Sequence, residues 1–266
     1  LGSLHGVPFS VKDWIDVAGL PCGEKLAGFS DHMPKEDATA VSRLRQAGGI
    51  VLGKTTVRED NDAYGKVFNP YNLNYSPTGS SSGEAALIAS GGSPLGLGSD
   101  SGGSIRQPAH VCGIAGLKPT TGRVPLTGHF PPLVPLNDPR TVIGPMARYV
   151  EDLALALPII AGPDWRDSSV IPMPLGNYHK VDLSKLKVAF YTQHAGGIPK
   201  ADTVETVHNV AKALSDVCAV VEEKVPPRIE EIYPITLDYW NRLESTDLDE
   251  WQHEGTNKLD GAAVAK

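Results

Sequence analysis

The chain has 266 residues and a formal net charge of −7, which comes from 24 basic and 31 acidic side chains. This acidic balance disfavours general binding to nucleic acid or to an acidic membrane surface, because both need a basic protein surface. The sequence is 41% hydrophobic and 21% charged, and it holds no apolar run of about 18 residues. We therefore expect a soluble globular protein with a sizeable core and no transmembrane helix.

The cysteine content indicates a reducing compartment. The three cysteines, Cys22, Cys112 and Cys218, are widely spaced and offer neither a disulfide framework nor a paired zinc motif. We therefore expect reduced thiols and a cytoplasmic protein. The sequence begins at Leu1 rather than at methionine, so we expect further residues upstream, and a targeting segment among them stays open.

The first predicted elements are a strand, a helix and a second strand. Residues 5–15 are apolar before the lysine at position 12 and are typical of an extended run. Residues 39–47 carry apolar side chains on one helical face, with Asp37 as the expected N-cap and Gly48 as the stop. Residues 50–52, Ile-Val-Leu, predict a short buried strand.

Helices and strands continue to alternate further along the chain. Residues 84–90 predict a short alanine-rich helix that ends at two glycines, and residues 95–97 predict another strand. This order indicates an α/β fold with helices on the faces of a sheet. Residues 124–140 contain five prolines and predict a loop, which is either a lid or pocket wall or a plain connector.

The C-terminal part predicts a helix and then a β-α-β unit. Residues 150–161 have a helical pattern, which Pro158 must kink or end. The β-α-β unit is predicted at residues 187–191, 202–214 and 219–222. Beyond residue 227 the sequence is charged and favours helix.

A glycine-rich turn supplies the candidate nucleophile. Residues 98–106 read Gly-Ser-Asp-Ser-Gly-Gly-Ser-Ile-Arg, and Ser104 follows two glycines that let the backbone turn tightly. A serine hydroxyl attacks a carbonyl only if a base takes its proton. The turn also directs amides toward one point, where they would bind an oxyanion. The expected donors are the backbone amides of Ser101, Gly102, Gly103 and Ser104.

Lys12 is the candidate base. A lysine with an ordinary pKa of about 10.4 is almost fully protonated at neutral pH and cannot accept a proton. Burial among Val7, Phe9, Val11 and Trp14 would lower this pKa, because desolvation disfavours the ammonium form. Taken alone, the pattern also fits a surface lysine at the end of a strand.

These segments, with the serine-rich turn at residues 78–84 and the stretches 112–123 and 144–148, resemble the amidase signature family. The resemblance covers most of the chain up to about residue 162. It implies a mixed β-sheet core covered by helices on both faces. It also implies further helices before the lysine and further strands after the last residue of this sequence.

The resemblance implies a single domain over residues 1–266. Its catalytic core would lie at about 5–162, and a β-α-β and helical extension at about 180–266.

The catalytic group of this family is Ser-Ser-Lys. The resemblance implies that Lys12 is the base, that Ser104 is the nucleophile and that Ser80 relays the proton between them. It also implies a cis peptide bond between Gly79 and Ser80. The separation of Ser80 and Ser104, 104 minus 80 or 24 residues, matches the family. Ser81 is the rival for the relay, because residues 80–82 are all serine.

Four further residues are expected to support the catalytic group. Asp100 and Arg106 are expected to pair and to brace the nucleophile turn, because an arginine–carboxylate pair has a fixed geometry. The alternative for Arg106 is an anionic group of the substrate. Gly79 would relieve crowding at the cis bond, and Ser81 lies beside the relay.

Two other motif matches are rejected on their context. Residues 48–55 fit the phosphate-loop pattern, but a helix precedes them and their middle predicts a strand. Residues 79–83 fit GxSxG, but no apolar strand precedes them. The eight histidines lack zinc-site spacing, so no metal and no cofactor are expected. His110 is a candidate pocket residue and a minor alternative base.

The sequence therefore predicts a serine amidohydrolase that cleaves a carboxamide, anilide, ester or carbamate bond of a small molecule, without nucleic acid or membrane as partner. Apolar side chains at residues 130–136 favour an apolar or aromatic substrate. An amidotransferase subunit that releases ammonia from glutamine is the first alternative, although residues 84–94 look more like stand-alone amidases. A non-catalytic binding protein on the same fold is the second, and the oligomeric state stays open.

Overall fold

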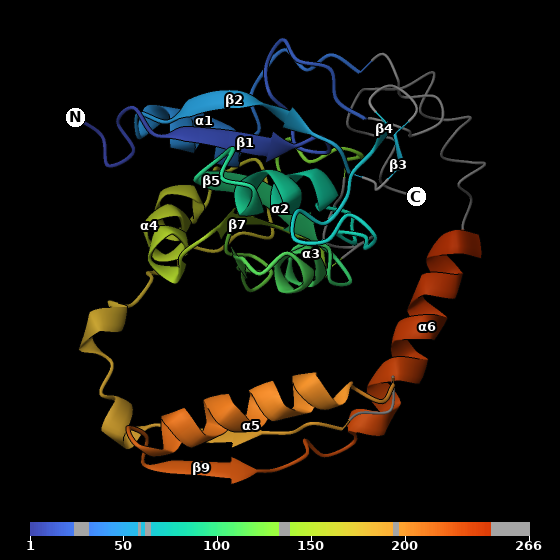
Figure 1. Cartoon of the computed structure of the whole chain (residues 1–266). Coiled ribbons are helices and arrows are strands. Elements are labelled where there is room, and N and C mark those ends of the chain that lie inside the picture. Colours follow the sequence, from blue (N-terminus) through green and yellow to red (C-terminus); the bar gives the residue numbers. More distant parts are fainter. Residues whose placement is uncertain (24–31, 58–59, 62–64, 133–138, 194–196, 246–266) are drawn as a thin grey trace. The chain divides into compact units, whose positions relative to one another are not determined.

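The chain divides into two compact units (Figure 1). The computed structural model describes residues 1–23, 32–57, 60–61, 65–132, 139–193 and 197–245. The first unit holds residues 1–175, and the second begins at Gly176. The boundary falls between the predicted catalytic core and the predicted C-terminal extension. No helix of the described residues is both long enough and apolar enough to cross a bilayer.

A five-stranded mixed sheet forms the centre of the first unit. Its strands lie in the order β2 (Ile50–Thr55), β1 (Pro8–Lys12), β5 (Leu95–Asp100), β7 (Val142–Ala147) and β6 (Ala115–Gly116). β1 is parallel to both β2 and β5, whereas β7 is antiparallel to β5 and to β6. The predicted α/β fold is thereby confirmed. A separate antiparallel pair is formed by β3 (Asp60–Asn61) and β4 (Gly65–Lys66).

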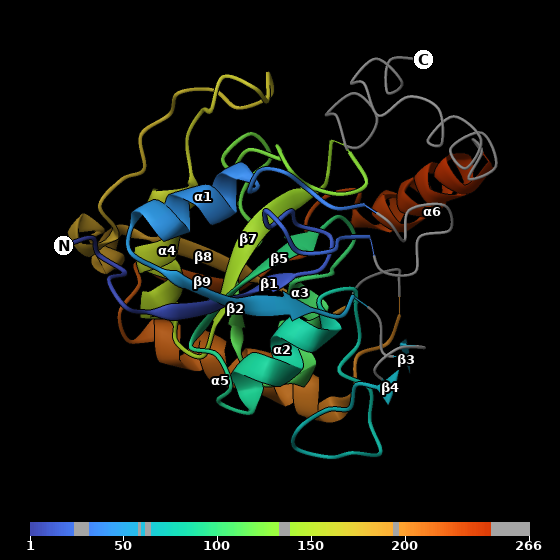
Figure 2. The ribbon, with the colours of Figure 1, turned by 90° about the horizontal axis from the view of Figure 1, so that it is seen from above.

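Helices cover both faces of the sheet. They are α1 (Thr39–Gln46), α2 (Ser82–Ala89), α3 (Arg106–Val111) and α4 (Val150–Ile160). Figure 2 shows α1 and α2 on opposite sides of the strands. The side chains of α1 and α4 join β1, β5 and β7 in one apolar cluster, and those of α2 and α3 form a second cluster with Met146.

The two faces of β1 carry different chemistry, because side chains alternate along a strand. Phe9 and Val11 belong to the apolar cluster with α1 and α4. Ser10 lies on the opposite face, where it donates a hydrogen bond to Glu84 of α2. Lys12 is two residues further along and shares the face of Ser10. The strand therefore presents polar groups to α2 and apolar groups to α1.

The first turn of α1 differs from the prediction. Ala38 is the N-cap residue, and no side chain caps this helix. The predicted cap, Asp37, instead accepts a hydrogen bond from the Ala18 amide at 2.9 Å and lies 3.3 Å from the Arg45 guanidinium. Gly48 does follow the helix end, with a φ of +98° that favours glycine.

Strand β2 has the predicted location but not the predicted burial. Ile50 and Leu52 are 55% and 52% exposed, because β2 lies at the end of the strand order in the described sheet. Residues 50–55 form this strand and so fill the middle of the rejected phosphate-loop match.

Two further features concern proline. Pro158 lies inside α4, which ends two residues later at Ile160. β7 is not among the predicted strands, because its sequence Val-Ile-Gly-Pro-Met-Ala contains two residues that are depleted in strands. Residues 124–132 form no helix or strand, as the predicted loop requires, and residues 133–138 lie outside the described part.

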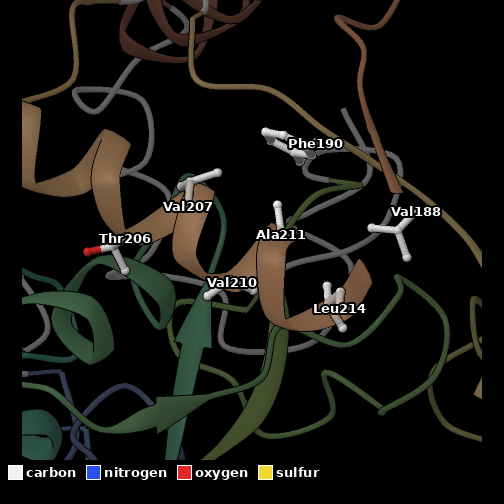
Figure 3. Close-up of a pocket in the computed structure, with 7 residues that line it drawn as sticks. All are labelled: Val188, Phe190, Thr206, Val207, Val210, Ala211 and Leu214. Carbon is white, nitrogen blue, oxygen red and sulfur yellow. The ribbon is translucent and has the colours of Figure 1, made fainter. Parts of the chain in front are cut away.

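The second unit contains the predicted β-α-β arrangement. Strands β8 (Lys187–Phe190) and β9 (Val220–Glu223) are parallel, and α5 (Ala201–Ser215) connects them. Figure 3 shows a mainly apolar hollow between α5 and β8, lined by Val188, Phe190, Thr206, Val207, Val210, Ala211 and Leu214. Two short 3-10 turns, Tyr178–Lys180 and Leu183–Lys185, precede β8, and α6 (Ile229–Ser245) follows β9.

Candidate active site

Lys12 lies at the carboxyl end of β1 with its side chain completely buried. Its Nζ donates hydrogen bonds to Ser80 Oγ at 2.7 Å and to the carbonyl oxygen of Ser99 at 3.2 Å. The ring centroid of Trp14 is 5.0 Å from Nζ. Burial of Lys12 was expected, but its surroundings differ from the expectation, because Phe9 and Val11 pack on the other face of the strand.

Burial lowers the pKa of the Lys12 amine from 10.5 to about 7, although the nearby carboxylates of Asp100 and Glu84 favour the ammonium form. Desolvation of the charge outweighs these two attractions. The adjacent Asp13 is engaged elsewhere, since it accepts the Gly23 amide at 2.9 Å and lies 3.9 Å from Lys54 Nζ. A large fraction of Lys12 is therefore uncharged near neutral pH and is able to accept a proton.

The turn before α2 presents Ser80 to the lysine. The peptide bond between Gly79 and Ser80 is cis, as the family resemblance implies. Thr78 has a φ of +55°, a region that favours glycine. The hydroxyl of Ser81 is buried and donates to the carbonyl oxygen of Ser99 at 3.4 Å. Of the two rival serines, Ser80 is therefore the one in contact with Lys12.

Ser104 lies in the turn between β5 and α3, which Asp100 holds in place. The fully buried carboxylate of Asp100 accepts hydrogen bonds from the backbone amides of Gly103, Ile105 and Arg106 at 2.8–3.2 Å. The guanidinium of Arg106 adds two more, at 3.0 and 2.9 Å. The ion pair expected from the sequence is thus present.

The charge on Asp100 is stable over a wide pH range. Burial raises its pKa, but the hydrogen bonds from Arg106 and from the backbone amides outweigh that effect and lower the pKa to about 2. The turn that carries Ser104 is therefore built around a carboxylate that stays charged, and the Arg106 guanidinium pairs with this carboxylate.

A backbone hydrogen bond joins the two serine turns. The amide of Ser81 donates to the carbonyl oxygen of Ser104 at 3.2 Å. No hydrogen bond joins the side chains of Ser80 and Ser104 in the described part of the chain, and catalytic hydrogen bonds are often long before substrate binds. Lys12 ends β1 and Asp100 ends the parallel strand β5, so the site lies where open α/β sheets usually bind ligands.

One of the four expected oxyanion-hole donors has another partner. The Gly103 amide donates to Asp100 Oδ1 at 2.8 Å, and its φ of +126° suits glycine. The amides of Ser101, Gly102 and Ser104 stay the predicted donors. The hydroxyl of Ser101 is hydrogen-bonded to that of Thr141, the residue before β7.

Two residues of the site escaped the sequence reasoning. The carbonyl oxygen of Ser99 accepts from Lys12, and its hydroxyl contacts Nε2 of the buried His129 at 3.0 Å. The His129 Nδ1 lies 3.2 Å from the Pro131 carbonyl oxygen. A backbone acceptor carries no side-chain signal in the sequence, and His129 lies in the segment read as a loop.

His110 does not take part in this arrangement. It is exposed near the last turn of α3. Ser104 precedes the first turn of that helix. Although His110 is close to Ser104 in sequence, it makes no hydrogen bond with Ser80 or Lys12 in the described residues.

The described residues contain one group of side chains with metal-ligating atoms, Asp16, Cys22 and His32, within 4.8 Å of one another. Each already has a protein partner. Nε2 of His32 lies 3.1 Å from Asp16 Oδ1, and the Cys22 thiol donates to the Asp13 carbonyl oxygen at 2.8 Å. Burial raises the pKa of Cys22 and so favours the thiol over the thiolate that binds metal. The spacing of histidines in the sequence does not reveal this group, because its three side chains are an aspartate, a cysteine and a histidine.

Comparison with known proteins identifies the relatives of this chain. Residues 1–260 match the family model described as Amidase. A glutamyl-tRNA(Gln) amidotransferase subunit from Halothermothrix orenii is 38% identical over 241 residues, which are 86% of this chain and 49% of that protein. The chain thus spans about half the length of such curated relatives.

Solved structures resemble the chain as well. The structure of 6-aminohexanoate cyclic dimer hydrolase in complex with its substrate matches with a TM-score of 0.79 and 25% identity, over 100% of this chain and 62% of that one. Fatty acid amide hydrolase matches with a TM-score of 0.77 and 29% identity, over 99% and 51% of the two chains. With a family model that spans nearly its whole length, this chain belongs to the amidase signature family.

Proposed function

We propose that this chain is a serine amidohydrolase that cleaves an amide-type C–N bond of a small molecule, either a carboxamide, an anilide or a carbamate, through an acyl-enzyme. The observation that supports it most is the buried Lys12 amine, 2.7 Å from Ser80 Oγ, with a pKa lowered to about 7. A buried amine that is partly uncharged at neutral pH is costly for a fold and is typical of a general base.

In the first step Ser104 attacks the substrate carbonyl. The uncharged amine of Lys12 accepts the Ser80 proton, and Ser80 accepts the Ser104 proton, so the hydrogen bond between Lys12 and Ser80 reverses its direction. A bond forms between Ser104 Oγ and the carbonyl carbon, and the carbonyl oxygen becomes an oxyanion. The amides of Ser101, Gly102 and Ser104 are the proposed donors to it, and the loss of one such donor typically costs about 2.7–4 kcal/mol.

In the second step the C–N bond breaks. The proton held by Lys12 returns through Ser80 to the leaving nitrogen, which departs as an amine or as ammonia. Water then attacks the acyl-enzyme with the same relay as base, and the acid product leaves Ser104 free. Asp100 and Arg106 hold the turn throughout and exchange no proton.

Adduct mapping with a fluorophosphonate tests this proposal. Ser104 Oγ forms a bond to phosphorus, fluoride leaves, and the proton passes to Lys12. Mass spectrometry of the digested protein is expected to place the adduct on Ser104. Lys12→Ala should slow labelling by about 10²–10⁴-fold, the usual contribution of a general base. An adduct on Ser81, or equal labelling in Lys12→Ala, would overturn the assignment.

A second candidate function is that of a glutamine-hydrolysing amidotransferase subunit. The curated relatives favour it, because they are named as subunits of glutamyl-tRNA(Gln) amidotransferases. The same three side chains would then release ammonia from glutamine for use by partner subunits. Ammonia release from glutamine that requires added partner subunits and transfer RNA would support this function, whereas hydrolysis of simple amides by the chain alone would support the first.

A further inference from the structure

The carboxyl group of Glu84 is a buried ionisable group that the proposed mechanism does not use. It lies in the first turn of α2, and its side chain is fully buried. Ser10 of β1 donates to Oε2 at 2.6 Å, and Thr55 of β2 donates to Oε1 at 2.8 Å. Oε2 also fills the space over Gly96 of β5, where an added Cβ would lie 2.1 Å from it. The carboxyl group is thus fixed against three adjacent strands.

Glu84 lies on the same face of the sheet as Lys12. Its partner Ser10 precedes Lys12 by two residues on β1, and side chains at that spacing share a face. Ser80, which contacts Lys12, lies four residues before Glu84 in the segment that leads into α2. The short segment that enters α2 therefore connects the proposed relay serine to a buried carboxyl group, and both side chains contact side chains of the strand that carries the lysine.

The contacts of Glu84 suit a carboxylate. Both oxygens accept hydrogen bonds from hydroxyl groups, which favours the charged form, and the charges of Lys12 and Lys54 favour it further. Burial opposes ionisation and raises the pKa of Glu84 to about 7. The attraction is mutual, since Glu84 in turn favours the ammonium form of Lys12.

We propose that Glu84 is a positioning residue for Lys12: its carboxylate stabilises the protonated amine and holds the Ser80 turn against β1, so that it contributes, together with Asp100, to the pH above which Lys12 acts as a base. This inference rests on the proposed role of Lys12. It adds a residue outside the Ser-Ser-Lys group that affects the pH at which the group is active.

The other charged and titratable groups near this pair do not replace Glu84. Asp100, at the end of β5, attracts Lys12 more strongly than Glu84 does, but it also accepts hydrogen bonds from Arg106 and from three amides of the nucleophile turn. The charge of Lys54 on β2 also favours the ionised form of Glu84, and Lys54 donates a hydrogen bond to the Asp13 carbonyl oxygen. His129 contacts Ser99 rather than Lys12. Substitution of Glu84 therefore changes the one anion that α2 contributes to the site.

The substitution Glu84→Gln tests the proposal, because it removes the charge and keeps the shape, while one of the two hydroxyl donors must turn to accept from the new amide. Since the charge of Glu84 favours the ammonium form of Lys12, the pKa of Lys12 should fall in this variant. The full chain with ¹³Cε,¹⁵Nζ-labelled lysine reports this pKa by NMR, and the Lys12 signal is identified by its loss in Lys12→Met. An unchanged or raised pKa of Lys12 overturns the proposal.

The rate of fluorophosphonate labelling at Ser104 gives a second measurement. Its acid limb should move to lower pH in Glu84→Gln by the same amount as the NMR titration. Labelling close to pH 7, where part of Glu84 is ionised and Lys12 titrates, should then be faster than in the wild-type chain after scaling to each plateau. Labelling that is slower at every pH, with an unmoved midpoint, means that Glu84 only supports the packing of α2, and this contradicts the proposal.

Two control substitutions separate charge from packing. Ile88→Val trims a fully buried side chain of the same helix and should lower stability without moving the midpoint. Glu151→Gln removes a carboxylate from the exposed first turn of α4 and should change neither. A midpoint that moves equally in Glu84→Gln and Ile88→Val would attribute the shift to loosened packing and overturn the inference.

The measurements distinguish this inference from the proposed function. If the wild-type chain labels at Ser104 with an acid limb that Glu84→Gln leaves in place, only the role of Glu84 fails. If the wild-type chain does not label at Ser104, or if the Lys12 pKa is close to its ordinary value, the proposed catalytic group fails and the role of Glu84 falls with it.

Discussion

At the scale of single residues, the proposed chemistry depends on the surroundings of the Lys12 amine. Its amine is buried against Ser80, Ser99 and Trp14, and burial lowers its pKa far enough to leave much of it uncharged near pH 7. The sequence places a lysine in an apolar run, which is also how a snorkelling surface lysine looks. Only contact with the turn at Ser80, which is distant in sequence, decides between the two.

The two rival serines should respond differently to substitution. Ser80→Ala removes the group between Lys12 and Ser104 and should slow labelling of Ser104 by about 10²–10⁴-fold. Ser81→Ala removes a hydroxyl that donates to the Ser99 carbonyl oxygen, so it should lower the free energy of unfolding by about 1 kcal/mol and largely preserve the rate. Labelling rates and urea denaturation of both variants check this. A larger rate loss in Ser81→Ala would reverse the assignment.

At the scale of elements, the site forms where α2 and the nucleophile turn meet the ends of parallel strands. The close packing of α2 on β5 requires glycine at position 96, where an added Cβ would lie 2.1 Å from Glu84 Oε2. Gly96→Ala should therefore lower the free energy of unfolding by about 1–3 kcal/mol or more. Gly176→Ala is the matched control, because nothing lies within 4 Å of its Cβ position. Equal stability of the two variants in urea would refute this packing argument.

The nucleophile turn depends on the charge of Asp100. Asp100→Asn keeps the shape but turns one acceptor into a donor that faces Arg106 or the Gly103 amide. We expect the free energy of unfolding to fall by about 1–3 kcal/mol, the usual cost of unsatisfied buried groups, and labelling of Ser104 to slow. Thermal unfolding and labelling rates measure both effects. If Asp100→Asn labels at the wild-type rate, the turn does not need this anion.

At the scale of the whole molecule, the buried lysine makes stability depend on pH. The pKa of Lys12 is about 7 in the folded chain and close to 10.5 when unfolded, so between these values the unfolded chain binds the extra proton. The free energy of unfolding should therefore rise with pH over this range. Lys12→Met should lack that rise, which amounts to a few kcal/mol because one pKa unit is about 1.36 kcal/mol. Urea denaturation at pH 7 and pH 9 compares the two. Parallel pH dependence would show that Lys12 is charged in the fold.

Much of the fold follows from local patterns in the sequence. Alternating helices and strands predict an α/β sheet, and the family resemblance implies that this sheet is mixed. The β8-α5-β9 unit appears where the change of periodicity places it. β7 is missed because glycine and proline interrupt it, and it forms because its position between β5 and β6 supplies partners. The exposed face of β2 is missed because a sequence pattern does not reveal which strand ends the described sheet.

The candidate site is predictable only in part, for a related reason. Motifs at three separate places indicate Lys12, Ser80 and Ser104, and the structure brings the first two into contact. In the sequence, Glu84 is only the first residue of a predicted alanine-rich helix. A single carboxylate among apolar neighbours nevertheless indicates that the group is buried with a partner. The carbonyl oxygen of Ser99 and the engagement of the Gly103 amide depend on backbone geometry, which side-chain identity does not encode.

The pH dependence of Ser104 labelling by a fluorophosphonate tests the role of Lys12 most directly. Since only the uncharged amine accepts a proton, the rate should rise as pH passes through about 7, the pKa of buried Lys12, and then reach a plateau. In Lys12→Met, labelling of Ser104 should be slow and should not show this rise with pH. A labelling rate that stays constant from pH 5.5 to pH 9, on either side of that pKa, in the wild-type chain would contradict a Lys12 base acting through Ser80.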